Sequence, residues 1–170
     1  MKKLNLGCGY NKLNGYINLD YEEKNNPDIV WNLNSYPYPF TDNEFDYIRA
    51  SNIIEHITDV TKAMNELWRI TKSTGEIYIS VPHYNHIDSY SDVTHIHFFS
   101  PDSFDMFAKD EECYHITDRK FVMLEKNIVS SGFGRFVPKR LLWCLSLMIG
   151  NLVSRIEVRL RPIKEKKVKL

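Results

Sequence analysis

The sequence predicts an α/β fold in which a parallel sheet packs against helices. Short apolar runs recur along the first half of the chain, and Gly, Asp, Asn or Pro ends them, which is typical of buried strands. Between the fourth and fifth runs, residues 60–68 carry apolar side chains at the i, i+3, i+4, i+7 and i+8 spacing of a helix with one buried face. Strands that alternate with a crossover helix favour parallel pairing.

The individual elements follow from these patterns. Either Thr58 or Asp59 can cap the helix, and we expect Gly75 to end that element. Pro82 closes the fifth strand because it cannot donate to a sheet ladder. The expected strands are residues 4–6, 18–20, 29–31, 45–51 and 77–81.

Two glycines directly after the first strand indicate a ligand site. Gly7 and Gly9 allow a sharp turn and a close approach of a ligand to the backbone. Asp20 ends the second strand, where a carboxylate can accept two hydrogen bonds from a ribose diol. Together these residues predict a nucleoside pocket, although a Gly-x-Gly is also compatible with an ordinary turn at the end of a strand.

The spacing around this turn bears on which nucleoside is bound. A dinucleotide fingerprint needs a third glycine three positions after Gly9, and this position is Lys12. Gly7 and Asp20 are only 13 residues apart, whereas a Rossmann unit with a full helix needs roughly 20. A short turn without a phosphate cradle favours S-adenosylmethionine and disfavours a nicotinamide-dependent oxidoreductase.

Composition is consistent with one domain over residues 1–170, because a chain of this length can bury a sizeable core. The net charge is zero, but residues 135–170 hold 10 Lys and Arg against 2 Asp and Glu. The three cysteines have neither disulfide nor metal-ligand spacing, and no signal peptide precedes the first strand, so we expect a cytoplasmic protein.

Several of these runs together resemble a known family, the small class I S-adenosylmethionine-dependent methyltransferases of the methyltransferase type 11-like subgroup. The runs that carry the resemblance are residues 4–9, 15–20, 39–46, 54–56, 67–72, 92–95 and 98–104. The resemblance implies a Rossmann-like three-layer sandwich with a mostly parallel seven-stranded sheet and an antiparallel last strand. Residues 163–170 are the expected closing strand.

The resemblance also implies which residues contact S-adenosylmethionine. Asp20 would hold the ribose hydroxyls, and Asn32 stands where the family often has an acidic residue facing the adenine amine. Glu55 and His56 would face the methionine portion, although a salt link at a helix entry without ligand contact remains an alternative for both. The full expected set is Leu6, Gly7, Cys8, Gly9, Asp20, Asn32, Leu33, Ser51, Glu55 and His56.

A histidine-rich loop follows the fifth strand. Within fifteen residues it contains His83, His86, Asp88, Asp92, His95 and His97. The loop could form a substrate pocket in which His95 or Asp92 takes a proton from the acceptor, since imidazole has a suitable pKa. It could bind a divalent metal through His95, His97 and Asp92, or it could be a structural lid. We interpret His95 and Asp92 as the catalytic residues and assign no metal.

The segment 139–161 is hydrophobic with basic flanks, and we expect it to be helical. It is too short and interrupted to span a bilayer. It could pack on the sheet, or it could contact an anionic membrane surface peripherally. We expect no nucleic-acid partner because the chain has no recognisable recognition module.

The predicted function is therefore methyl transfer from S-adenosylmethionine to an O or N atom of a small-molecule or glycan-type acceptor. The alternative is a cofactor-binding or inactive interaction subunit that uses its basic C-terminal segment. The sequence leaves the acceptor and the oligomeric state open.

Overall fold

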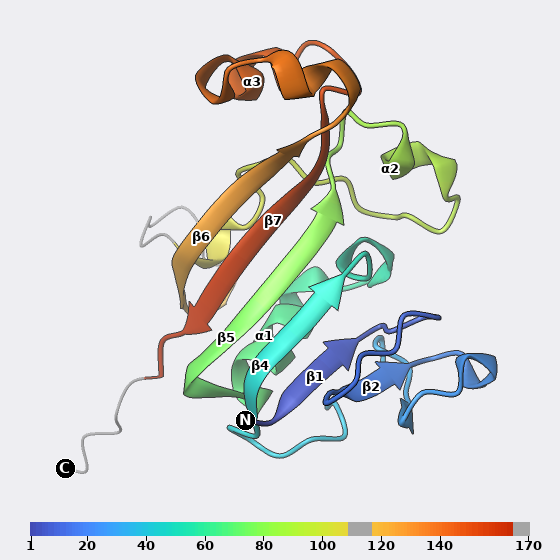
Figure 1. Cartoon of the computed structure of the whole chain (residues 1–170). Helices are drawn as coiled ribbons and strands as arrows, with labels where there is room; N and C mark the ends of the chain where they lie inside the picture. The colour runs from blue at the N-terminus through green and yellow to red at the C-terminus, as the bar shows by residue number, and fades with distance from the viewer. Residues whose placement is uncertain (109–116, 165–170) are drawn as a thin grey trace.

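The computed structural model describes residues 1–108 and 117–164 and contains one sheet of seven strands (Figure 1). The strands lie in the order β3-β2-β1-β4-β5-β7-β6. Their bounds are β1 Lys3–Leu6, β2 Ile17–Asp20, β3 Ile29–Val30, β4 Phe45–Ser51, β5 Thr71–Pro82, β6 Phe121–Ser130 and β7 Val153–Pro162. The helices are α1 Val60–Ile70, α2 Asp88–Ser91 and α3 Lys139–Ser146, with short 3-10 turns η1 Glu23–Asn25, η2 Ile54–His56, η3 Asp105–Phe107 and η4 Gly132–Phe136.

The pairing confirms the predicted fold class. β1, β2, β3, β4 and β5 pair in parallel, whereas β7 pairs antiparallel with both β5 and β6. A mostly parallel seven-stranded sheet with an antiparallel last strand is the Rossmann-like arrangement expected above. The carboxyl ends of the parallel strands therefore meet at one edge, where ligands bind in such sheets.

The closing strand differs from the one expected from sequence. It is β7, Val153–Pro162, rather than residues 163–170, and residues 165–170 lie outside the described part of the chain. The segment 139–161 is accordingly not one helix, because α3 ends at Ser146 and the strand begins at Val153. The reason is a period-2 pattern: Ile156, Val158 and Leu160 are buried, and charged residues alternate with them.

Helix α1 forms as its sequence predicts. The Asp59 side chain accepts a hydrogen bond from the backbone N–H of Lys62 at 2.9 Å and caps the first turn. The helix ends at Ile70, however, and not at Gly75, which lies inside β5. A Cβ at Gly75 would be 2.8 Å from the carbonyl oxygen of Phe45, so this glycine permits the close approach of β4.

The two faces of the sheet are covered unequally. Helix α1 packs on the face that lies behind the sheet in Figure 1, and its buried side chains join the main core. On the opposite face of β4 and β5, Tyr47, Arg49 and Tyr78 are only half-buried. No helix of the described residues covers this front face, so the expected third layer is reduced there to short loops and polar side chains.

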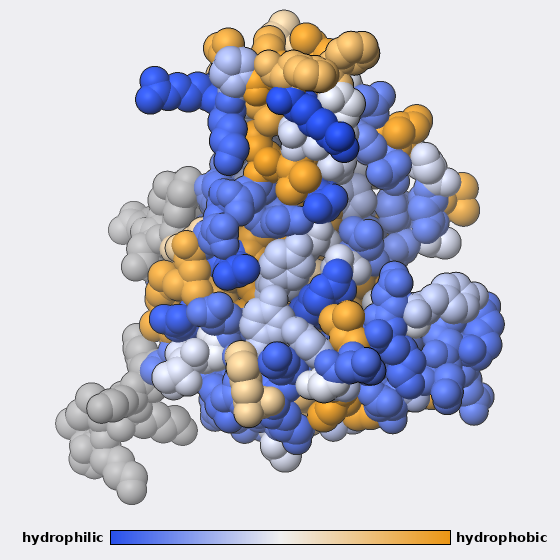
Figure 2. Space-filling model, viewed as in Figure 1, coloured by the Kyte–Doolittle hydropathy of each residue, from blue (hydrophilic) through white to orange (hydrophobic). Residues whose placement is uncertain are grey.

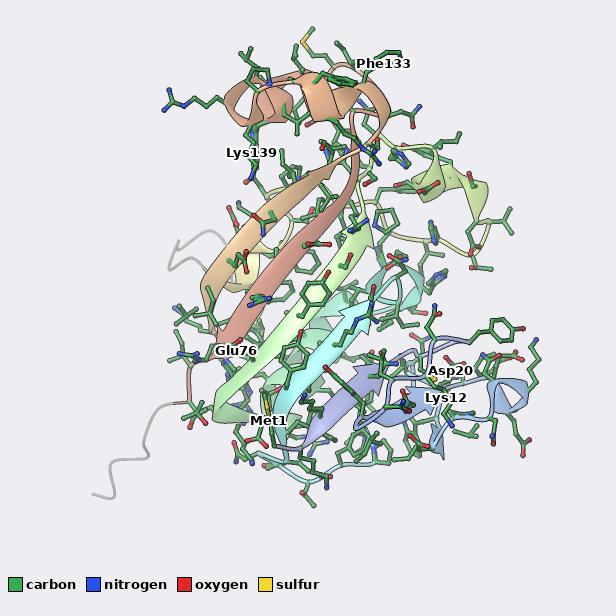
Figure 3. All side chains as sticks on the ribbon, viewed as in Figure 1. Met1, Lys12, Asp20, Glu76, Phe133 and Lys139 are labelled. Carbon is green, nitrogen blue, oxygen red and sulfur yellow. The ribbon has the colours of Figure 1, made fainter. Side chains whose placement is uncertain are left out.

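The end of the molecule around α3 carries an apolar surface. Phe133, Phe136 and Met148 have 83%, 85% and 85% of their surface exposed. Figure 2 shows apolar residues gathered over α3, and Figure 3 places Phe133 and Lys139 there. Among the helices that the structure describes, none has the length and apolar character needed to cross a membrane.

Candidate active site

The turn after β1 has the conformation that its glycines permit. Gly7 and Gly9 have φ angles of +64° and +48°, in the left-handed region that favours glycine. A Cβ on Gly7 would overlap the side chain of Ile53, in the loop after β4. Gly9 has no atom within 4 Å of the position a Cβ would take, so open space adjoins the backbone at this glycine.

Asp20 lies where the loops after β1 and β2 meet (Figure 3). Its side chain is nearly buried, and its Oδ2 accepts a hydrogen bond from the backbone N–H of Gly9 at 2.6 Å. Its Oδ1 accepts from the Glu22 N–H at 2.9 Å and from the Asn25 side chain at 3.3 Å. A carboxylate has about four acceptor positions, so Asp20 holds the turn together and retains capacity for one further donor.

The remaining residues expected at the cofactor lie in different surroundings. Leu6, Cys8 and Leu33 are buried, while Ser51 is half-buried at the end of β4. Asn32 is exposed, and its Oδ1 accepts a hydrogen bond from the Asn34 N–H at 2.9 Å. The amide oxygen expected to face adenine is therefore engaged in a local turn.

Glu55 is the most unusual side chain in this region. It belongs to η2, is 1% exposed, and neither carboxylate oxygen has a hydrogen-bond partner among the described residues. Burial raises its pKa to about 7, because a charged carboxylate is poorly solvated there. The nearest cationic candidate is His95, whose Nε2 lies 4.0 Å from Oε1 of Glu55.

Hydrogen bonds fix the orientation of both neighbouring histidines. His95 Nδ1 donates to the carbonyl oxygen of Ser89 at 3.1 Å, since a carbonyl only accepts, and this leaves Nε2 facing Glu55. The Thr94 hydroxyl donates to Asp92 at 2.6 Å, and therefore accepts from His56 Nδ1 at 2.9 Å. Burial, and then the proximity of His95, lowers the pKa of His56. In the neutral form of either ring, the lone pair is therefore on Nε2.

These groups line a cavity of about 430 Å³. Its wall brings together the loop after β4, the loop after β5 and the beginning of β7. The lining residues are Asn52, Glu55, His56, Pro82, Asp88, Asp92, His95, Ser154 and Arg155. The volume lies within the range typical of small-molecule sites, and every lining residue except Pro82 is of a polar or charged type.

The histidines of the histidine-rich loop line two different cavities. His97 lines a different cavity of about 540 Å³, and its Nε2 donates to the carbonyl oxygen of Thr58 at 3.3 Å. The metal set suggested by the sequence, which combines His97 with His95 and Asp92, is therefore not brought together. The group that does converge is Glu55, His56 and His95.

Comparison with known proteins bears on this geometry. Residues 4–79 match the family model of a methyltransferase domain, and no curated protein matches the chain. The S-adenosylmethionine-dependent methyltransferase from Archaeoglobus fulgidus aligns at 15% identity over 94% of this chain and 85% of its own, with a TM-score of 0.62. One from Mesorhizobium loti aligns at 12% identity over 94% and 90%, with a TM-score of 0.63.

A third similar structure is the complex between the Trm112 methyltransferase activator and a putative methyltransferase from Haloferax volcanii. It aligns at 12% identity over 96% of this chain and 83% of that chain, with a TM-score of 0.64. At such identities the likeness concerns the fold, and the family match adds the sequence relationship. Residues 4–79 thus match the methyltransferase domain family, and the chain as a whole has the fold of S-adenosylmethionine-dependent methyltransferases.

The cofactor indicated for this methyltransferase domain is S-adenosylmethionine. The residues present fit a nucleoside of that kind. Open space adjoins Gly9, and the Asp20 carboxylate lies 2.6 Å from its N–H with acceptor capacity left. Gly9 and Asp20 are therefore residues that could hold the sugar of the cofactor.

The sequence did not place Ser154 or Arg155 at the site, and it considered Arg155 only as a basic flank of the expected helix. Ser154 and Arg155 enter the cavity from β7, because Arg155 pairs with Pro82 at the end of β5. The signal that could have located them is the alternation of apolar and charged residues in β7. Interpreting this segment as a helix with basic flanks hides that alternation.

His83 provides a test of the electrostatics near the methyltransferase cavity. It is fully buried, and burial, then the neighbouring His86, lowers its pKa to about 4. A depressed histidine pKa stabilises the fold fully above the unfolded value of 6.5 and ceases to do so as pH falls toward 4. Between pH 6.5 and pH 4, we expect the protonation of His83 in the unfolded state to lower the free energy of unfolding by about 3 kcal/mol.

Urea unfolding of wild type and His83→Asn between pH 7 and pH 4 measures this contribution. Asparagine keeps a polar side chain but does not titrate, so its stability should fall less steeply than that of wild type. Equal slopes for the two proteins would show that His83 is protonated in the folded state at an ordinary pH.

Proposed function

We propose that residues 1–170 form one methyltransferase domain that methylates an O or N atom of a small-molecule or glycan-type acceptor. The observation that supports this is the segment 51–56, which joins the two halves of the site. Ile53 lies against Gly7 at the cofactor turn, whereas Glu55 and His56 line the polar cavity. An acceptor in the cavity would thus be adjacent to the cofactor's methionine end.

S-adenosylmethionine held at Gly9 and Asp20 would supply an electrophilic methyl group on a sulfonium, and its sulfur would leave as a neutral thioether. An acceptor O or N atom that takes this methyl group must lose its proton. We assign the promotion of that proton loss to the cluster around His95. His95 lines the cavity, and its hydrogen bond to the carbonyl oxygen of Ser89 holds the orientation of its ring.

Asp92 has a different role in this proposal. Its hydrogen bonds from Thr94 lower its pKa, so it is a weak base. Through the Thr94 hydroxyl it fixes the tautomer of His56. Asp92 is therefore a positioning residue, and His95 is the candidate catalytic residue.

The polar lining supports a polar acceptor. Ser154 and Arg155 line the same cavity as the histidines and come from a different element, β7. A hydroxyl and a guanidinium in the lining suit an acceptor with hydroxyl or anionic groups. A cytoplasmic site of action remains part of the proposal.

Calorimetry with S-adenosylhomocysteine, followed by methyl-transfer assays on a panel of polar acceptors, tests this function. We expect a thermal shift and saturable binding of S-adenosylhomocysteine, with transfer to at least one acceptor. Absence of binding at millimolar ligand would overturn the cofactor assignment. Binding without transfer to any acceptor would favour the interaction subunit.

We also propose a peripheral contact between the α3 end and an anionic lipid surface. Phe133, Phe136 and Met148 are exposed there, and no acidic residue lies between Glu125 and Glu157 in the sequence. An apolar surface with basic residues and no acidic residues suits anionic headgroups.

Wild type should co-sediment with phosphatidylserine vesicles, and the double variant Phe133→Ser, Phe136→Ser should not. Sedimentation that survives both substitutions would contradict this contact.

A further inference from the structure

We propose that Glu55, His56 and His95 form a binding site for a divalent transition-metal cation in the wall of the 430 Å³ cavity. A carboxylate oxygen of Glu55 and one ring nitrogen of each histidine all lie within 4.8 Å of one another. Two of the residues are adjacent in η2, and the third comes from the loop after β5. The convergence is therefore a product of the fold and not of local sequence alone.

The hydrogen bonds of the two histidines prepare them as ligands. Each commits its Nδ1 hydrogen to the protein, His95 to the carbonyl oxygen of Ser89 at 3.1 Å and His56 to the Thr94 hydroxyl at 2.9 Å. Metal-binding histidines commonly donate their second ring N–H in this way, which fixes the tautomer and the ring orientation. The arrangement leaves Nε2 of both rings free to ligate.

Glu55 provides the independent observation that a cation belongs here. It is 1% exposed, and both of its carboxylate oxygens lack a hydrogen-bond partner within residues 1–108 and 117–164. Buried polar groups are nearly always paired, because leaving one unpaired carries a large desolvation penalty. His95 Nε2 lies 4.0 Å from Oε1 of Glu55, too far for a hydrogen bond, and in the neutral ring it offers a lone pair and not a hydrogen.

A divalent cation between the three groups would pair with the two unpartnered oxygens of Glu55 and be ligated by both imidazole rings. The ligand types indicate its identity: two imidazoles and one carboxylate suit Zn²⁺, Fe²⁺, Co²⁺ or Mn²⁺ better than Ca²⁺ or Mg²⁺, which prefer oxygen ligands. Three protein ligands also leave coordination positions open, and these would face the cavity.

This site deepens the proposed function and, as regards its role, rests on it. A hydroxyl group of the acceptor that ligates the cation has a lowered pKa, so its proton leaves to solvent more readily before methyl transfer. The cation would also fix the position of the acceptor oxygen. The acceptor class is then an alcohol, phenol or sugar hydroxyl that can reach an open metal position.

Cobalt binding by chelator-treated full-length protein tests the site directly. We expect one Co²⁺ per chain, with visible absorption bands that Zn²⁺ displaces. Glu55→Gln, which keeps the side-chain shape, and His95→Ala should each weaken Co²⁺ binding by at least about 10- to 100-fold, the loss seen when even an outer partner of a ligand is removed. His97→Ala is the matched control, because His97 lines the other cavity and should leave Co²⁺ affinity unchanged.

S-adenosylhomocysteine binding is measured on the same samples, so a failure of the metal site can be told apart from a failure of the proposed methyltransferase function. Normal S-adenosylhomocysteine binding without Co²⁺ binding would overturn the metal site and leave the methyltransferase function standing. Co²⁺ binding that is equal in wild type, Glu55→Gln and His95→Ala would also overturn it. Site-specific Co²⁺ binding without S-adenosylhomocysteine binding would support the metal site and overturn the proposed function.

Discussion

His95→Ala is expected to lower methyl-transfer turnover by about 10²- to 10⁴-fold, the usual cost of losing a group that promotes proton transfer. His95 lines the cavity and faces Glu55, whereas the cofactor turn lies at Gly7, Gly9 and Asp20. The Kd of S-adenosylhomocysteine should therefore change little. Steady-state rates and calorimetry on the same variant measure the two effects separately.

His97→Ala is the control for this prediction, because it removes a second histidine of the same loop from a different cavity. Its turnover should stay within a few-fold of wild type. If His95→Ala weakened cofactor binding as strongly as turnover, the residue would be holding the loop in place and not acting on the acceptor.

Asp20→Ala is expected to weaken cofactor binding by about 1.5–3 kcal/mol, the scale of a hydrogen bond to a charged group. The structure adds a second effect. Because Asp20 accepts hydrogen bonds from the Gly9 and Glu22 N–H groups, its removal should also lower the melting temperature of the free protein. Calorimetry with S-adenosylhomocysteine and thermal unfolding measure the two effects.

The variant Asn25→Ala distinguishes the loss of cofactor affinity from the loss of loop stability. Asn25 donates to Asp20 at 3.3 Å, so its loss disturbs the same loop and leaves the carboxylate in place. We expect it to lower stability slightly and to leave cofactor affinity near that of wild type. Equal weakening of binding by both variants would mean that Asp20 acts only through the loop.

The sequence was most informative where the deciding contacts are local. The strand at residues 45–51 has the bounds of β4, and the Asp59 cap and the buried face of α1 follow from residue spacing within a few positions. The parallel sheet followed from the order of these elements. Each of these features depends on contacts between residues that are close in the sequence, and the order of residue types is enough to predict such contacts.

Features that depend on distant residues were missed or misplaced. β7 carries an alternating pattern, but its basic residues also suit a helix rim, and only pairing with β5 and β6 decides between the two. The structure places His95 beside Glu55, forty residues earlier in the chain, and His97 in a different cavity, and residue types alone record neither position. The resemblance located the segment 54–56, and the fold showed which of its groups lacks a partner.

The position of β7 has a consequence for synthesis of the chain. The loop after β5 is held by residues made much later: His83 N–H donates to Ser154, and Ile87 N–H donates to Asn151, 64 positions on. At about 5–20 residues per second, a ribosome needs roughly 3 to 15 s to cover that interval. During this time β5 lacks the partner that β7 provides on that edge, so its unpaired backbone N–H and C=O groups are open to pairing with other nascent chains. The cavity therefore takes shape only after most of the chain has been translated, and emerging polypeptides of this protein should depend on chaperones until then.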